Sequence, residues 1–100
     1  MTQPRKRTVI PTEFRATGLS GKGNVRNVSD GGLFVRTSAI PDAGDCVELK
    51  LNAPGKPPIE VTGLVWWTTS QLEAPNGRSG FGLRLLGQSE SYLRLLESLE

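Results

Sequence analysis

The sequence of 100 residues contains no histidine, one cysteine and only six aromatic residues. Without histidine the chain lacks the usual general base at neutral pH, and it cannot complete a Ser-His-Asp or Cys-His centre. The lone Cys46 cannot form an intramolecular disulfide, which is typical of a cytoplasmic protein. These absences argue against zinc-finger and hydrolase classes. We therefore expect a binding module and not an enzyme, with no metal and no cofactor.

Long apolar stretches are also missing. No run approaches the ~20 residues that span a bilayer, and residues 1–7 lead into no apolar signal core. Charged residues make up 22% of the chain and hydrophobic residues 36%, a balance that excludes a highly charged disordered chain. A chain of this length is typical of one domain. We expect a single cytoplasmic domain over residues 1–100 with no membrane insertion.

Positive charge is concentrated at the N-terminus. Residues 1–26 carry six basic side chains and one acidic one, whereas residues 27–100 carry six basic and nine acidic ones. The net charge of +2 therefore divides into +5 and −3. Such a basic head indicates an anionic partner, although a solvated, solubilising tail explains it equally well.

Short segments with a two-residue period follow one another along the chain, separated by glycine-rich connections. Three prolines make residues 53–58 a turn. Adjacent side chains in a strand point to opposite faces, so we expect one ring of Trp66 and Trp67 inside and the other outside. A core residue beside an exposed aromatic is the favoured interpretation, and a stacking platform for a base or a contact patch for a partner is the alternative. The predicted strands cover residues 12–17, 24–28, 32–37, 46–51, 59–67 and 81–85.

The period changes near the C-terminus. Apolar side chains recur at i, i+3, i+4 and i+7, which predicts one buried helical face made of Tyr92, Leu95, Leu96 and Leu99. Ser89 is the expected N-cap, and Glu90 and Arg94 form an i, i+4 pair. We predict a mainly all-β fold, a six-stranded antiparallel β-barrel with a short C-terminal α-helix. Its parts are a flexible basic arm (1–10), the barrel (12–87) and the helix (89–99).

One segment between two predicted strands combines turn residues with polar side chains. Asn27 and Ser29 bond readily to backbone groups in turns, and the glycines at 31 and 32 permit close approach of another molecule. As an isolated pattern, this segment is typical of an ordinary hairpin turn.

The wider context of this segment resembles the PilZ domain family, whose members are bacterial receptors for cyclic di-GMP. Asn27, Ser29 and Gly32 match the family's [DN]xSxxG motif residue by residue. Residues 44–49 resemble its fourth-strand entry, 63–67 its Gly-x-Val-x-Trp-like strand, and 80–85 its closing Gly-x-Gly strand. The resemblance covers nearly the whole chain. It implies the PilZ type of six-stranded barrel with a C-terminal helix.

The family's N-terminal RxxxR motif is degenerate in this sequence. The second arginine would fall on Val9 if Arg5 were the first, and the first would fall on Gln3 if Arg7 were the second. An arginine pairs bidentately with a guanine edge or a phosphate, whereas Lys6 supplies only charge. The resemblance implies that the ligand, cyclic di-GMP, is bound by six residues: Arg5, Lys6, Arg7, Asn27, Ser29 and Gly32.

Three functions remain open. The first is a cyclic di-GMP receptor that relays the level of this second messenger to an effector protein in motility, exopolysaccharide or biofilm control. The second is a degenerate PilZ-like adaptor that binds only protein. The third is a nucleic-acid-binding barrel that uses the basic arm and an aromatic strand, but most aromatic residues are better placed in a core. The basic arm is expected to be open in the free protein and to close over an anionic ligand.

Overall fold

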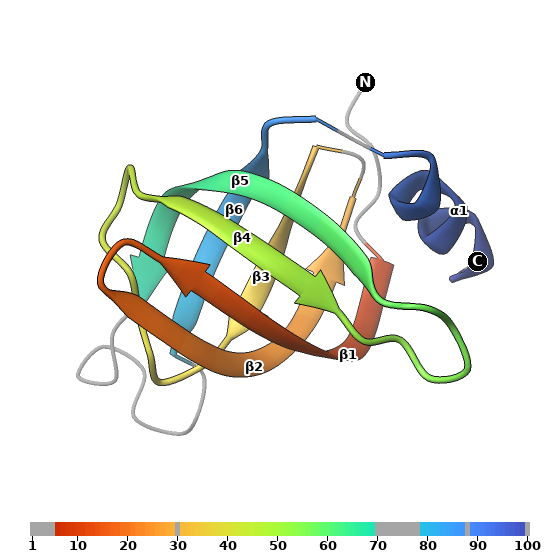
Figure 1. Cartoon of the computed structure of the whole chain (residues 1–100), viewed down its shortest axis with the longest axis horizontal. Coiled ribbons are helices and arrows are strands. Elements are labelled where there is room, and N and C mark those ends of the chain that lie inside the picture. The colour runs from red at the N-terminus through yellow and green to blue at the C-terminus, as the bar shows by residue number, and fades with distance from the viewer. Residues whose placement is uncertain (1–5, 30, 70–78, 88, 100) are drawn as a thin grey trace.

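The computed structural model describes residues 6–29, 31–69, 79–87 and 89–99. Strands and one helix follow in the order predicted (Figure 1), which confirms the expected fold class. Their bounds are β1 (Lys6–Ala16), β2 (Leu19–Val28), β3 (Gly32–Arg36), β4 (Cys46–Leu51), β5 (Ile59–Thr69), β6 (Gly80–Leu85) and α1 (Glu90–Ser98).

All neighbouring strands are antiparallel, and they close into a barrel in the order β1-β2-β3-β6-β5-β4. Strands β1, β2 and β3 form one continuous meander, and β4, β5 and β6 form a second. The two meanders join where β3 pairs with β6 and where β1 pairs with β4. The barrel therefore consists of two consecutive halves of the chain.

The core fills the inside of the barrel. In β4 every second residue is buried, as the alternation in the sequence predicts. Phe14 from β1 and Phe81 from β6 meet edge to face, with ring centroids 5.1 Å apart. Aliphatic side chains from all six strands surround this pair, so the two halves share one core.

Helix α1 covers one end of the barrel (Figure 1) and buries Tyr92, Leu95 and Leu96 in the core. The Ser89 hydroxyl accepts a hydrogen bond from the Tyr92 backbone N–H at 3.1 Å, which confirms the expected N-cap. Arg94 donates to Glu90 at 2.6 Å, as expected. The described part of the chain contains no helix that is long and apolar enough to cross a membrane.

The predicted limits of the arm and of the first strand are wrong. Strand β1 begins at Lys6, within the expected arm, because β2 extends far enough to offer partners to the first residues of β1: Lys6 lies opposite Val28, and Arg7 opposite Asn27. The β-branched residues Thr8, Val9 and Ile10 also favour an extended chain. Residues 1–5 lie outside the described residues.

Candidate functional site

A single row of paired backbone positions runs around the wall of the barrel. Arg7 lies opposite Asn27, Asn27 opposite Phe34, Phe34 opposite Gly82, and Gly82 opposite Trp67. The row thus crosses five strands and places the basic N-terminal segment in line with the Asn27 motif. Residues from distant parts of the sequence become neighbours because β3 pairs with β6.

Both tryptophans lie on the outside of the barrel, so the expectation of one ring inside and one outside is wrong. The register of β5 and β6 shifts between Val65 and Trp67, and this bulge interrupts the alternation of side chains. The exposed fractions are 64% for Trp66 and 39% for Trp67. The Trp67 ring stacks on Phe34, with centroids 5.1 Å apart and an angle of 15° between the planes.

The stacked pair depends on Gly82, which lies between Phe34 and Trp67 in the row. A Cβ atom at this position would lie 2.6 Å from Cε2 of Trp67, so no side chain fits under the indole. The absence of a side chain lets the Trp67 ring reach across β6 to Phe34. The result is a flat aromatic surface in the middle of the row.

A guanidinium group adds a cation to this aromatic surface. Arg84 is exposed on β6, and its Cζ atom lies 5.1 Å from the centroid of the Trp66 ring, within the range of a cation–π contact. The described residues contain no carboxylate in a salt bridge with Arg84, Arg26 or Arg36, the arginines of β2, β3 and β6. The Nε atoms of Arg26 and Arg36 are buried without a hydrogen-bond partner. This side of the barrel is therefore both aromatic and basic.

The turn between β2 and β3 forms the other side of the site. The backbone N–H of Ser29 donates to the Gly32 carbonyl at 2.9 Å, and its hydroxyl donates to the same oxygen at 3.2 Å. The Leu85 N–H donates to the Gly31 carbonyl at 3.0 Å. A Cβ atom on Gly32 would lie 2.6 Å from the Leu83 carbonyl oxygen, so only glycine fits this close pairing of β3 with β6.

These features enclose a pocket of about 290 Å³. The turn residues, the aromatic pair and Arg84 all line it, and the complete lining is 27–29, 31–34, 66–67 and 82–84. Polar groups on one side thus face a stacked aromatic surface and a cation on the other. Such a combination suits a planar, anionic ligand, because rings stack on the aromatic surface while hydrogen-bond donors hold the anion.

Three of the six predicted site residues, Asn27, Ser29 and Gly32, line this pocket together. The backbones of Lys6 and Arg7 lie beside its turn, paired with Val28 and Asn27. Arg5 and the side chains of Lys6 and Arg7 lie outside the described residues. No sequence motif identifies Phe34, Gly82 or Arg84 as site residues, although each occupies an outward position in a predicted strand.

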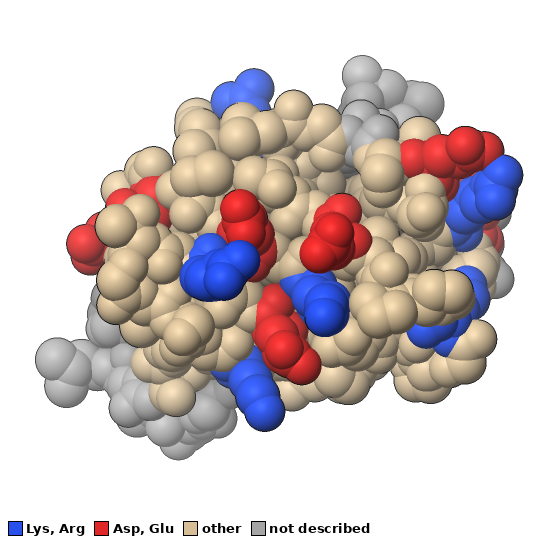
Figure 2. Space-filling view, in the orientation of Figure 1, with Lys and Arg blue, Asp and Glu red and all other residues tan. Residues whose placement is uncertain are grey.

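A wider hollow of about 610 Å³ lies on another face of the barrel, over β1, β4 and β5. Figure 2 shows acidic and basic side chains alternating on this face. Arg15 and Glu48 form a salt bridge of 3.2 Å, and Glu13, Lys50 and Glu60 lie beside them. The three carboxylates of this hollow outnumber its two cations, so it offers no net positive charge to an anion, and the smaller pocket is the better candidate.

Within residues 6–29, 31–69, 79–87 and 89–99, no three cysteine, aspartate or glutamate residues gather in an arrangement that could hold an ion. The side chains that line the candidate site carry aromatic, amide, hydroxyl and guanidinium groups.

The structure is thus a closed six-stranded barrel that carries an aromatic, basic pocket on its outer surface. The family model for the PilZ domain matches residues 2–99, and the chain therefore belongs to the PilZ domain family. Domains of this family are binding or adaptor modules. A comparison with curated proteins found no match.

A solved structure with the same fold is that of the Bacillus subtilis inhibitor of motility MotI/DgrA. The TM-score is 0.79 at 15% sequence identity, and the match covers 99% of this chain. It covers 49% of the other protein, so this chain spans about half the length of MotI/DgrA. The likeness confirms the six-stranded barrel with its C-terminal helix.

Proposed function

We propose that the chain is a receptor module that binds cyclic di-GMP in the pocket beside Asn27 and passes the signal to an effector protein in the cytoplasm. The observation that carries this proposal is the row from Arg7 through Asn27 and Phe34 to Trp67. It aligns a cationic segment, a polar turn and a stacked aromatic surface. Membership of the PilZ family supports the same ligand class.

The chemistry of cyclic di-GMP matches the groups that surround the pocket. The ligand carries two anionic phosphates and two guanines, whose edges present the O6 and N7 acceptors. The Asn27 amide and the Ser29 hydroxyl line the pocket and would bind the guanine and phosphate region. Gly32 serves the close pairing of β3 with β6 and does not leave room for the base, because the Leu83 carbonyl occupies the space beside it. Trp67 and Phe34 offer a planar surface for a purine, and Arg84 adds a cation.

The size of the pocket indicates that it holds only part of the ligand. A volume of about 290 Å³ lies at the lower end of the range for small-molecule sites. We therefore assign one guanine and its phosphate to the pocket, with Arg5, Lys6 and Arg7 closing over the remainder. Arg5 and Arg7 are separated by one residue and not by three, but each still supplies a guanidinium fork that can pair with a guanine edge or a phosphate.

Isothermal titration calorimetry of the whole chain with cyclic di-GMP tests this proposal. We expect a dissociation constant in the micromolar range or tighter, about −8 kcal/mol or better. Cyclic di-AMP is the matched control, because adenine replaces the O6 acceptor with a donor and should bind more weakly. Single-stranded DNA serves as a second control for nonspecific attraction to the basic segment.

The adaptor function is the second candidate, and the degenerate RxxxR motif at residues 3–9 favours it. In that case the aromatic surface would serve a protein partner and the effector would be recognised without a nucleotide. No heat and no NMR shifts with millimolar cyclic di-GMP would reject the receptor proposal and select the adaptor. Control of motility, exopolysaccharide or biofilm formation is the proposed output of the receptor.

A further inference from the structure

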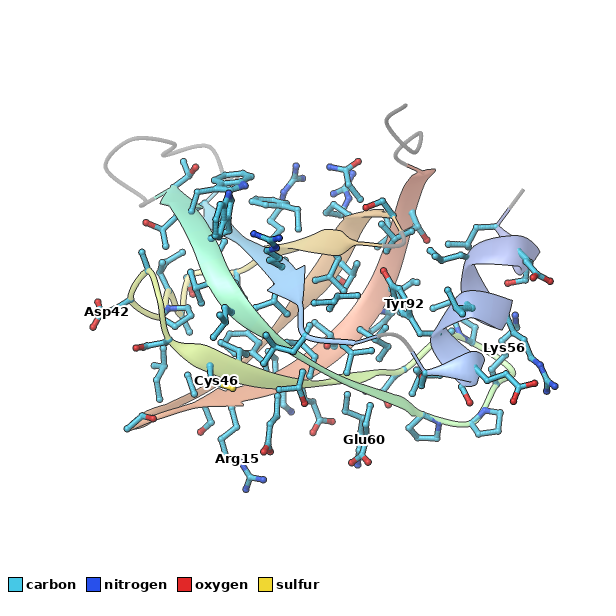
Figure 3. All side chains as sticks on the ribbon, turned by 90° about the horizontal axis from the view of Figure 1, so that it is seen from above. Arg15, Asp42, Cys46, Lys56, Glu60 and Tyr92 are labelled. Carbon is cyan, nitrogen blue, oxygen red and sulfur yellow. The ribbon has the colours of Figure 1, made fainter. Side chains whose placement is uncertain are left out.

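Helix α1 contacts the pocket turn directly, through Tyr92. The Tyr92 hydroxyl donates a hydrogen bond of 2.6 Å to the backbone carbonyl of Ser29, which lies 63 residues earlier in the chain. Figure 3 shows the Tyr92 side chain between α1 and the barrel. This bond joins the C-terminal element to the turn that lines the proposed binding pocket.

The turn depends on this contact for part of its geometry. The N–H and the hydroxyl of Ser29 both donate to the Gly32 carbonyl, and the Ser29 carbonyl accepts from Tyr92. The Ser29 hydroxyl proton is thus directed into the turn, which leaves the oxygen lone pairs to accept a bond from a ligand. A rotation of Ser29 as a whole would break the bond to Tyr92 and would also redirect this hydroxyl.

Tyr92 itself cannot follow such a rotation without a movement of the helix. Its side chain is fully buried in the core together with Leu95 and Leu96. Its backbone N–H is held by the Ser89 cap at 3.1 Å. The phenol ring therefore moves only together with α1, and its hydroxyl holds the Ser29 carbonyl in place.

We infer that Tyr92 is a positioning residue for the ligand-binding turn, and that ligand binding and the docking of α1 stabilise each other through its hydrogen bond to Ser29. This inference rests on the proposed function, because it assigns a supporting contact to the same site. Thermodynamic linkage makes this effect reciprocal. If the contact raises the affinity for the ligand by some factor, the bound ligand raises the equilibrium constant for forming the contact by the same factor. Helix α1 is then the element that carries the occupied state to a partner.

The test compares the full-length protein with Tyr92→Phe, which keeps the ring and removes only the hydroxyl. Thr12→Val is the matched control, because Thr12 is equally buried and donates its hydroxyl to the Lys50 carbonyl at 2.9 Å, between β1 and β4 and away from the turn. If ligand binding depends on the full net strength of one ordinary hydrogen bond, the dissociation constant for cyclic di-GMP should be about 2- to 12-fold higher in Tyr92→Phe. Thr12→Val should bind like the wild type.

Amide hydrogen exchange provides a readout that a purely stabilising role for Tyr92 would not change. In the wild type, cyclic di-GMP should slow exchange in both the turn at 29–32 and helix α1. In Tyr92→Phe the slowing should persist in the turn and disappear from the helix. Wild-type affinity in Tyr92→Phe, or equal slowing of helix exchange in both proteins, would overturn the inference while the receptor proposal stands.

The two proposals fail separately. A wild type without affinity for cyclic di-GMP rejects the receptor proposal and, with it, the coupling of ligand to helix. Hydrogen exchange of the variants without ligand then still tests the bond between Tyr92 and Ser29. Loss of the Tyr92 hydroxyl should accelerate exchange at the turn amides, compared with exchange at the same amides in Thr12→Val. Unchanged turn exchange in free Tyr92→Phe would reject the positioning role as well.

Discussion

Substitution of Gly82 by alanine tests whether the aromatic surface of the pocket depends on an empty space in β6. The added Cβ would lie 2.6 Å from Cε2 and 2.8 Å from Cδ1 of Trp67, closer than carbon atoms pack. The indole is 39% exposed and can swing outward, so Trp67 should leave Phe34 while the barrel stays folded. The loss is then the stacking interaction, about 0.5–1.5 kcal/mol.

A thermal melt and near-UV circular dichroism measure the two consequences. At about 4–8 °C per kcal/mol for a domain of this size, the melting temperature should fall by about 2–12 °C. The near-UV signal of the tryptophans should weaken because the Trp67 ring loses its fixed environment. Cyclic di-GMP should also bind more weakly, because the planar surface for a purine is gone.

Gly87→Ala is the matched control for this substitution. A Cβ atom at Gly87 meets no atom within 4 Å, so this variant reports only the effect of alanine on the unfolded chain, a stabilisation of about 0.4–1 kcal/mol. The comparison with Gly82→Ala therefore isolates the clash with Trp67. If both variants melt together and keep the wild-type near-UV spectrum, Trp67 does not lie over Gly82 and our description of the pocket is incorrect.

Three further predictions concern the turn and the basic segment. Gly32→Ala should lower the free energy of unfolding in urea by about 1–3 kcal/mol, because the Leu83 carbonyl that it meets is backbone; an unchanged midpoint would contradict this. Arg7→Ala should weaken cyclic di-GMP binding by about 1.5–3 kcal/mol in calorimetry, whereas Arg15→Ala, on the β1–β4 face, should not. Equal affinities of the two variants would show that Arg7 does not contact the ligand. The affinity of the wild type should fall as potassium chloride is raised, and an affinity independent of salt would contradict a charged contact.

The parts of the fold that were predictable follow from local alternation. Strand β4 and helix α1 appear within one residue of the expected bounds, because their buried faces repeat without interruption. Strand β2 begins five residues earlier than predicted, at Leu19. Its glycines mark close packing and not turns: a Cβ on Gly21 would lie 2.8 Å from the Phe14 ring. Whether a glycine serves a turn or close packing is decided by the residue that lies against it in the folded protein.

The site was predictable only in part for a similar reason. Asn27, Ser29 and Gly32 stand close together in sequence, so a local motif identifies them. The stacking of Phe34 on Trp67 depends on a bulge opposite β6 and on the register of strands that are far apart in sequence. Neither the bulge nor the register is encoded in the alternation of a single strand.

The division of the barrel into two meanders determines when the pocket forms during folding. Each meander forms from neighbouring segments, whereas the joint between β3 and β6 brings together residues about fifty positions apart. The pocket lies across this joint, with Asn27 and Phe34 in the N-terminal half and Trp67 in the C-terminal half. During folding it is therefore completed only when the halves associate, a slow, non-local step. Two fragments cut between β3 and β4 should each lack the pocket and should regain it on reassembly, and a ligand that bridges the halves would favour that reassembly.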